Sequence, residues 1–168
     1  DPRAAVHAAF GGDGYPDDAR HKLIDGKVGS RNHHDGRWVG WYDAPEVAGA
    51  AGRQSQPTIV FDARYSVAID RLHVAYAVEH HLAIHAPDRL IISTSDDGDT
   101  FTELKTFTGF DDAWSHTGAR GIGHATPRFA HIDLSGAEAR YWRLEFYNDH
   151  EWTFISEVFF SPSDETRP

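Results

Sequence analysis

Cysteine and methionine are both absent from this chain of 168 residues. Without cysteine, disulfides and thiol chemistry are excluded, so the fold depends on an apolar core, which a chain of this length can form. Because translation begins with methionine, we expect the chain to be a piece of a larger protein. No apolar run reaches the length of a membrane span, and no signal peptide is visible, so we predict no membrane insertion.

Positively charged residues are few. The chain has 16 Lys and Arg against 26 Asp and Glu, which gives a formal net charge of −10. An acidic surface repels polyphosphate, so nucleic acid is excluded as a partner. The 12 histidines would offset this charge only at acidic pH. The composition, with 40% hydrophobic and 12% aromatic residues, is that of a folded globular chain.

Helical periodicity is nearly absent, and short strand patterns take its place. Turns rich in Gly, Pro and Asp separate these patterns, as in DDGDTF around Gly98. The segments with alternating, β-branched or aromatic residues are 58–63, 68–78, 89–95, 128–134, 141–147 and 152–160. The sequence therefore predicts an all-β fold, an antiparallel β-sandwich of the jelly-roll type. We expect a single domain over 1–168, in which 1–20 is an N-terminal linker or a first strand.

A long irregular stretch, LIDGKVGSRNHHDGRW (23–38), precedes the first regular strands. It combines glycines, Asp and Asn residues, two histidines and a tryptophan, and it has neither the helical nor the strand period. Loops of a sandwich collect at its ends, where binding residues are often placed on a rigid scaffold. A metal-binding loop, a ligand-binding loop and a solvated turn are the alternatives for this stretch.

This stretch and three later segments resemble discoidin-like domains, the coagulation-factor type C group. The group includes galactose-binding-like carbohydrate-binding modules appended to bacterial glycoside hydrolases. The opening motif is L-x-D-G-x-x-G-S-x-N followed by D-G-x-W-x-G, within 23–40, and the later segments are IVFDA (59–63), HAPDRLIISTSDDGDTF (85–101) and ARYWRLEFYNDHEWTFISEVFF (139–160). The resemblance covers about 23–160 and implies the galactose-binding-domain-like sandwich.

The resemblance also implies a Ca²⁺ site between the opening loop and the last strand. Ca²⁺ takes six to eight oxygen ligands, and Asp25, Ser30 and Asn32 offer side-chain oxygens in a loop whose glycines let carbonyls turn inward. Glu157 lies in the otherwise apolar FISEVFF, where an ion would offset the cost of burying its carboxylate. The ion would be structural. In the alternative reading, Asp25 begins an ordinary turn and Glu157 pairs with an arginine.

Catalytic readings have weaker support. EHHLAIH contains His80, His81 and His85, but this is not the helical H-E-x-x-H spacing of zinc enzymes, so we interpret them as polar loop residues. Carboxylate pairs such as Asp111 with Asp112 lie beside turns, where acidic residues are favoured anyway. No nucleophile elbow or phosphate-binding loop is present. We therefore predict that the domain is not an enzyme.

A sugar site needs an aromatic ring for the C–H face and planar polar groups for the hydroxyls. The connections 79–87 and 106–127 and the short loop after 147 supply this mixture. The candidate ligand-binding residues are Trp114, His81, His116, Arg120, Asn148 and His150. Trp114 belongs to no strand and is the preferred stacking platform. The other four tryptophans are assigned structural roles: Trp38, Trp41, Trp142 and Trp152.

These patterns together predict a non-catalytic carbohydrate-binding module, stabilised by Ca²⁺ and exported or displayed at the cell surface as part of a larger protein. Its expected partners are a carbohydrate ligand and the catalytic domain of the parent protein. The alternative is a structural or protein-interaction spacer that packs on a neighbouring catalytic domain and binds no glycan. A small enzyme, the third possibility, would require a pocket with two close titratable groups.

Overall fold

A computed structural model describes residues 5–7, 22–42, 58–113, 126–148 and 152–163 of the chain. Within these ranges strands dominate, and helical structure is confined to two short 3-10 turns, η1 (Lys22–Ile24) and η2 (His80–Leu82). The strands are β1 (Ala5–His7), β2 (Val39–Tyr42), β3 (Thr58–Val78), β4 (Arg89–Ser95), β5 (Thr102–Phe107), β6 (Thr126–Tyr147) and β7 (Trp152–Pro162). The predicted all-β class is confirmed. None of the described helical segments is long and apolar enough to cross a membrane.

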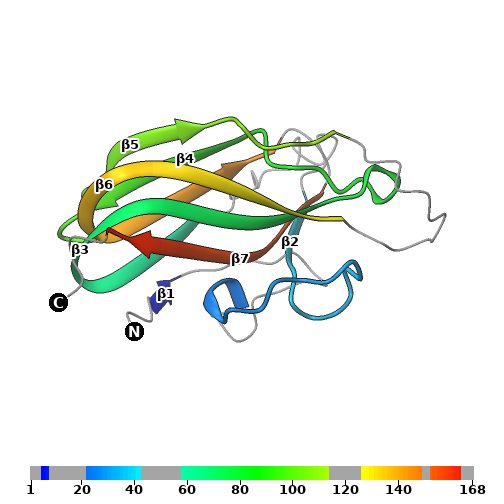
Figure 1. Cartoon of the computed structure of the whole chain (residues 1–168), viewed down its shortest axis with the longest axis horizontal. Coiled ribbons are helices and arrows are strands. Elements are labelled where there is room, and N and C mark those ends of the chain that lie inside the picture. Colours follow the sequence, from blue (N-terminus) through cyan, green and yellow to red (C-terminus); the bar gives the residue numbers. More distant parts are fainter. Residues whose placement is uncertain (1–4, 8–21, 43–57, 114–125, 149–151, 164–168) are drawn as a thin grey trace, which may run out of the picture.

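The seven strands form a folded sheet in the order β2-β7-β3-β6-β4-β5, and β1 pairs with β3. All of these pairings are antiparallel. The long strands β3 and β6 curve at one end of the molecule, so that each contributes to both layers (Figure 1). The first part of β3 and the last part of β6 lie with β1, β4 and β5, and their other parts lie with β7 and β2. The result is the predicted antiparallel sandwich.

The bend between the layers has a local cause in both long strands. The β3–β6 register is interrupted between Asp62 and Val67, and Arg64 within this interval has φ +69°. On β6, Gly136 has φ +70°, a backbone conformation that glycine adopts without strain. Arg140 donates two hydrogen bonds to the carboxylate of Asp62, at 2.9 and 3.0 Å, and so ties the strands together at the bend.

The core lies between the two layers and follows the period-two alternation of the strands. Trp142, Leu144 and Phe146 of β6 are all buried, as their alternation predicted. A smaller second cluster joins Trp38, Ala77, Ile84 and Phe154, with Leu82 and Trp152 packed against it. This second cluster lies where the opening loop, the η2 connection and β7 meet, so it fixes the loops to the sheets.

Candidate functional site

The connection between β3 and β4 is a tight, internally bonded turn at the end of the sandwich opposite the bend (Figure 1). Glu79 caps η2, because its side chain accepts a hydrogen bond from the backbone N–H of His81 at 3.2 Å. Ala83 adopts the left-handed conformation, φ +55°, and turns the backbone back toward Glu79. Glu79 and Ile84 then exchange two backbone hydrogen bonds of 2.9 and 3.0 Å. The turn is therefore closed and rigid.

The same turn is attached to the start of β7. The N–H of His85 donates to the carbonyl of Trp152 at 2.9 Å, and the N–H of Trp152 donates to the carbonyl of Ala83 at 2.9 Å. Ile84, between them, is buried in the second cluster against Trp38. These contacts place η2 beside the start of β7.

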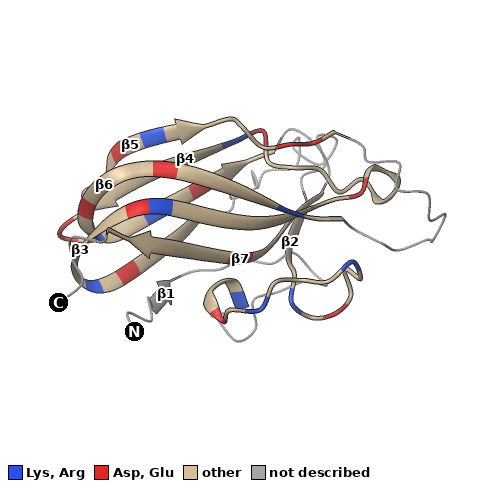
Figure 2. Cartoon of the chain, in the orientation of Figure 1, with Lys and Arg blue, Asp and Glu red and all other residues tan. Residues whose placement is uncertain are grey.

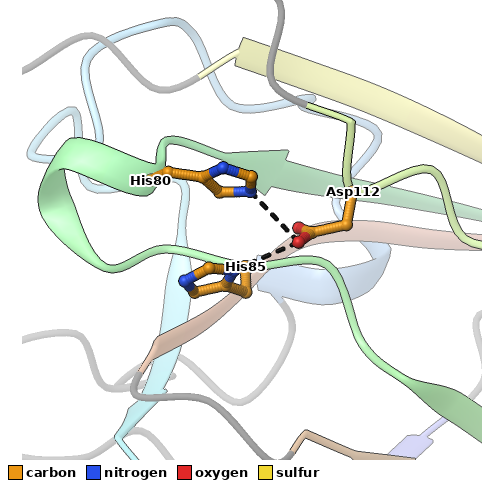
Figure 3. Close-up of side chains that lie close together, drawn as sticks. All are labelled: His80, His85 and Asp112. Atoms are coloured by element: carbon orange, nitrogen blue, oxygen red, sulfur yellow. Dashed lines mark hydrogen bonds and ion pairs between the residues drawn. The ribbon is translucent and has the colours of Figure 1, made fainter.

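His80 and His85 lie side by side across this turn, with their ring centroids 4.5 Å apart and an interplanar angle of 21° (Figure 3). Both rings approach the same carboxylate oxygen of Asp112, which comes from the segment after β5. His80 Nε2 is 3.0 Å and His85 Nδ1 is 3.1 Å from Asp112 Oδ2. Within the described residues this is the one group of three His, Cys, Asp or Glu side chains close enough to share a metal ion.

Backbone and side-chain groups hold Asp112 in place. Its other oxygen, Oδ1, accepts a hydrogen bond of 2.6 Å from the N–H of Ala86. Burial raises the pKa of the Asp112 carboxyl, but the hydrogen bonds from Ala86 and His85 and the two imidazoles outweigh it, and the net pKa is below its ordinary value. The carboxylate is therefore charged at neutral pH.

Tyr76 of β3 positions the residue before Asp112. Its hydroxyl accepts from the N–H of Asp111 at 2.9 Å and donates to the carbonyl of the same residue at 3.2 Å. Burial, the largest cause, raises the pKa of the Tyr76 hydroxyl, so it stays protonated and able to donate. The core strand β3 thereby fixes the position of Asp111, and with it the segment that carries Asp112.

Tyr76→Phe is expected to lower the free energy of unfolding by about 1–2 kcal/mol, because the N–H of Asp111 loses its acceptor in a partly buried setting, while the carbonyl of Asp111 keeps the hydrogen bond from Arg128. Denaturant unfolding would measure this change. Tyr65→Phe is the matched control, since Tyr65 is exposed and its hydroxyl is expected to contribute nothing. Equal stability of Tyr76→Phe and the parent protein would contradict the positioning role.

The predicted ligand-binding residues are only partly described. His81 is exposed on η2, next to His80. Asn148, which directly follows β6, is half-buried, and its side-chain amide donates a hydrogen bond to the hydroxyl of Thr153. Trp114, His116, Arg120 and His150 lie outside the described residues. Both described candidates belong to connections at the same end of the sandwich as the histidine pair (Figure 1).

Sequence reasoning did not group His80 and His85 with Asp112. Asp112 is 27 residues from His85 and 32 from His80, in a different connection, and no motif spans this separation. The signal that could have found the group is topological: the β3–β4 connection and the end of β5 both emerge at one end of a sandwich.

The opening loop lies beside β7 (Figure 1) and contacts this strand at Glu157 through the N–H of Gly26. Glu157 is the single charged residue of β7 (Figure 2) and is only 7% exposed. Its Oε2 accepts a hydrogen bond of 3.1 Å from the N–H of Gly26, whose φ of +76° suits glycine. Burial, together with the negative charge of Asp25, raises the pKa of Glu157 to about 7. The loop thus brings a second carboxylate toward a buried one.

Two of the four predicted metal ligands therefore fit an oxygen-seeking cation. A bound divalent ion removes the electrostatic repulsion between two carboxylates that lie in a partly desolvated place. Among the described residues, the arginine ion pairs go to other carboxylates than Glu157. Asp25 also accepts from the N–H of its neighbour Lys27 at 2.8 Å, which leaves its second oxygen beside the Lys27 ammonium at 3.4 Å.

The other two predicted ligands, Ser30 and Asn32, have local partners. The N–H of Asn32 donates to Ser30 Oγ at 3.1 Å, and the N–H of His34 donates to Asn32 Oδ1 at 3.0 Å. Asp35 accepts from the N–H groups of Ser30 and Arg37, at 2.7 and 2.9 Å. These bonds shape the second half of the loop as a series of side-chain-capped turns.

Trp38 explains why this half of the loop is compact. Its ring is 1% exposed, and its Nε1–H donates to the carbonyl of Ser30 at 3.0 Å. Position 29 must be glycine, because a Cβ there would lie 2.1 Å from Trp38 Cε2. Trp41 and Trp142 are buried as well, which agrees with their structural assignment.

A scan of protein families and a search of curated protein sequences gave no match. Solved structures do match over nearly the whole chain. CpGH89CBM32-6 produced by Clostridium perfringens is 14% identical, with a TM-score of 0.55 and coverage of 97% of this chain and 96% of that one. The GH31 module CBM32-2 bound to GalNAc is 13% identical, with a TM-score of 0.60 over 96% and 98%. The CBM32 of AlyQ in complex with 4,5-unsaturated mannuronic acid is 17% identical, with a TM-score of 0.54 over 94% and 93%.

The chain has the fold of a CBM32 module. The galactose-binding-domain-like architecture expected from the resemblance to discoidin-like domains is thereby confirmed. At these identities the likeness to CBM32 structures concerns the fold, and the residues of the binding loops have to be argued from this chain itself.

Proposed function

We propose that the domain is a non-catalytic carbohydrate-binding module that keeps a larger extracellular, glycan-active bacterial protein near its glycan. The observation that carries this proposal is the end-to-end match to CBM32 modules, of which one was solved with GalNAc and another with 4,5-unsaturated mannuronic acid. The acidic net charge of −10 is compatible with a neutral sugar and unfavourable for nucleic acid. The parent catalytic domain is the expected protein partner.

The sugar is expected at the end of the sandwich that carries η2. The closed turn at 79–84 holds His81 exposed at this end, and Asn148 directly follows the last residue of the neighbouring strand β6. Trp114, the stacking platform predicted from the sequence, follows Asp112 by two positions. Asp112 is itself held in place by the hydrogen bond from the N–H of Ala86. Binding residues attached to rigid segments lose less conformational entropy when the ligand binds.

A structural Ca²⁺ is the second part of the proposal. The paired carboxylates of Asp25 and Glu157 support it, because their repulsion and the burial of Glu157 favour a bound cation. Backbone carbonyls of the opening loop would supply further oxygens. The ion would fasten the loop to β7 and take no part in any reaction.

Glycan binding can be tested by calorimetric titration of the domain against a panel that includes GalNAc, galactose and uronate oligosaccharides. At least one glycan is expected to bind with modest affinity, since a shallow sugar site must desolvate many hydroxyls. Trp114→Ala is expected to weaken this binding at least about ten-fold through loss of stacking, whereas Trp114→Phe retains part of it. Tyr65→Ala, at the opposite end, is the control. A panel without any binder would contradict the proposal.

One observation favours the alternative of a protein-interaction spacer. Phe129 of β6 and Phe159 of β7 are each 52% exposed on a sheet face, and they flank His73 and His131 in a row of stacked or edge-on rings. Such a row would suit packing against a neighbouring domain. The same titrations decide, because a spacer shows no glycan affinity and the sugar-binding module does.

A further inference from the structure

The group formed by His80, His85 and Asp112 lies apart from the carboxylates of the opening loop and has a different chemistry. It offers two imidazole nitrogens and one carboxylate oxygen, all within 4.8 Å of one another. Ca²⁺ and Mg²⁺ prefer oxygen ligands, whereas imidazole combined with carboxylate suits Zn²⁺, Cu²⁺ or Ni²⁺. We propose that His80, His85 and Asp112 bind a divalent transition metal of the zinc type.

The distances agree with such an ion. In a tetrahedral zinc site with bonds of about 2.0–2.2 Å, neighbouring ligand atoms lie roughly 3.3 Å apart. The two imidazole nitrogens lie 3.0 and 3.1 Å from Asp112 Oδ2. These two distances need to lengthen by only a few tenths of an ångström to match such a site. Figure 3 shows both rings directing a nitrogen toward the carboxylate.

The supporting groups are those that a metal site needs. The N–H of Ala86 binds Asp112 Oδ1 and orients the carboxylate, as outer-shell donors do in metal sites. The left-handed Ala83 and the bonds between Glu79 and Ile84 keep the two histidines on one turn. The three side chains are partly buried, with exposed fractions of 27% and 20% for the histidines and 37% for Asp112. The ligands are therefore held in place and remain accessible to an ion.

Three protein ligands leave at least one coordination position for water or for an oxygen of a ligand. The metal would join the β3–β4 connection to the segment after β5, two positions before Trp114. It would thus brace the base of the predicted glycan-binding loop. The metal site itself does not depend on the glycan proposal, since it can be measured without any sugar.

The experiment uses the 168-residue domain without a polyhistidine tag, in buffer with saturating Ca²⁺ so that oxygen sites are filled. Zn²⁺ is titrated by calorimetry, and Co²⁺ is added to read the visible absorption of a tetrahedral site. One ion per chain is expected. His80→Gln, His85→Gln and Asp112→Asn are each expected to weaken Zn²⁺ binding at least about ten-fold. His81→Gln, an exposed histidine on the same turn, is the matched control and is expected to stay within two-fold.

NMR of the histidine side chains in the unmutated domain covers the case that a variant misfolds. Zn²⁺ is expected to shift the ring nitrogens of His80 and His85 and to leave His81 in place. Three results would overturn the proposal: no binding, binding that His81→Gln weakens as much as His85→Gln does, or shifts spread over other histidines. The group would then be a hydrogen-bonded cluster only. Because Ca²⁺ and glycan titrations are separate, failure here leaves the outcome of those tests readable.

Discussion

Trp38→Ala is expected to lower the free energy of unfolding by about 3–5 kcal/mol, the range for removal of a fully buried tryptophan. Trp38 fills the space between the opening loop, Ala77 of β3 and Phe154 of β7, and it also binds the carbonyl of Ser30. The loss is a large share of the stability of a typical domain, about 5–15 kcal/mol. Denaturant unfolding followed by circular dichroism would measure it.

Two further variants make the Trp38 prediction specific. Trp38→Phe keeps most of the ring but loses the Nε1–H donor, so we expect a smaller cost of about 1–2 kcal/mol. Tyr65→Ala removes an exposed ring and is expected to change the stability by less than about 0.5 kcal/mol. If Trp38→Ala cost no more than Tyr65→Ala, the packing of the opening loop on the sheets would be wrong.

The sequence predicted the all-β class and the core residues correctly, but it predicted the long strand β3 as two separate strands. The alternation of Trp142, Leu144 and Phe146 predicts a strand with one buried face, and these three residues are buried in β6. In contrast, β3 was predicted as two strands, 58–63 and 68–78. The polar residues 64–66 at its bend interrupt the pattern, although the chain continues through both layers. Hydrogen bonds to β6 decide this continuity, and no local pattern encodes them.

Strand β5 was not predicted, for a related reason. It is an edge strand that pairs only with β4 among the described strands, and its residues are mostly exposed. Polar residues such as Lys105 are common on edge strands, where they discourage pairing with other chains. An edge strand therefore lacks the apolar alternation that reveals a strand in a sequence.

The two candidate sites also differ in how far the sequence could predict them. The proximity of Asp25 and Glu157 follows from the resemblance to discoidin-like domains, and it also has a local signal, a carboxylate in an apolar strand. The proximity of His80 and His85 to Asp112 has no such signal, because it depends on where two connections emerge from the sandwich. Sequence patterns report the neighbours along a strand or turn, and side chains from separate loops meet only through the fold.

In the absence of divalent cations, Glu157 is expected to make the domain less stable as the pH rises from about 4.5 to 7. Burial and the charge of Asp25 raise the pKa of Glu157 from 4.5 to about 7, so in this interval the folded chain binds more protons than the unfolded chain. Stability then falls with increasing pH, by a total on the order of 3 kcal/mol. Unfolding in denaturant with a chelator, at pH 5 and at pH 8, would measure this difference.

Ca²⁺ is expected to reverse this loss, because it binds the ionised carboxylates of Asp25 and Glu157 in the folded chain. At a free concentration of 100 times the dissociation constant, the gain is about 2.7 kcal/mol, and it should be larger at pH 8 than at pH 5. Glu157→Gln removes the titrating group, so without metal it should be more stable than the parent protein at pH 8 and should lose the response to Ca²⁺. Glu103→Gln, on the exposed face of β5, should retain both the pH slope and the Ca²⁺ response. A pH slope without any Ca²⁺ response would leave Glu157 as a buried carboxylate that holds no ion, and the calcium proposal would fall.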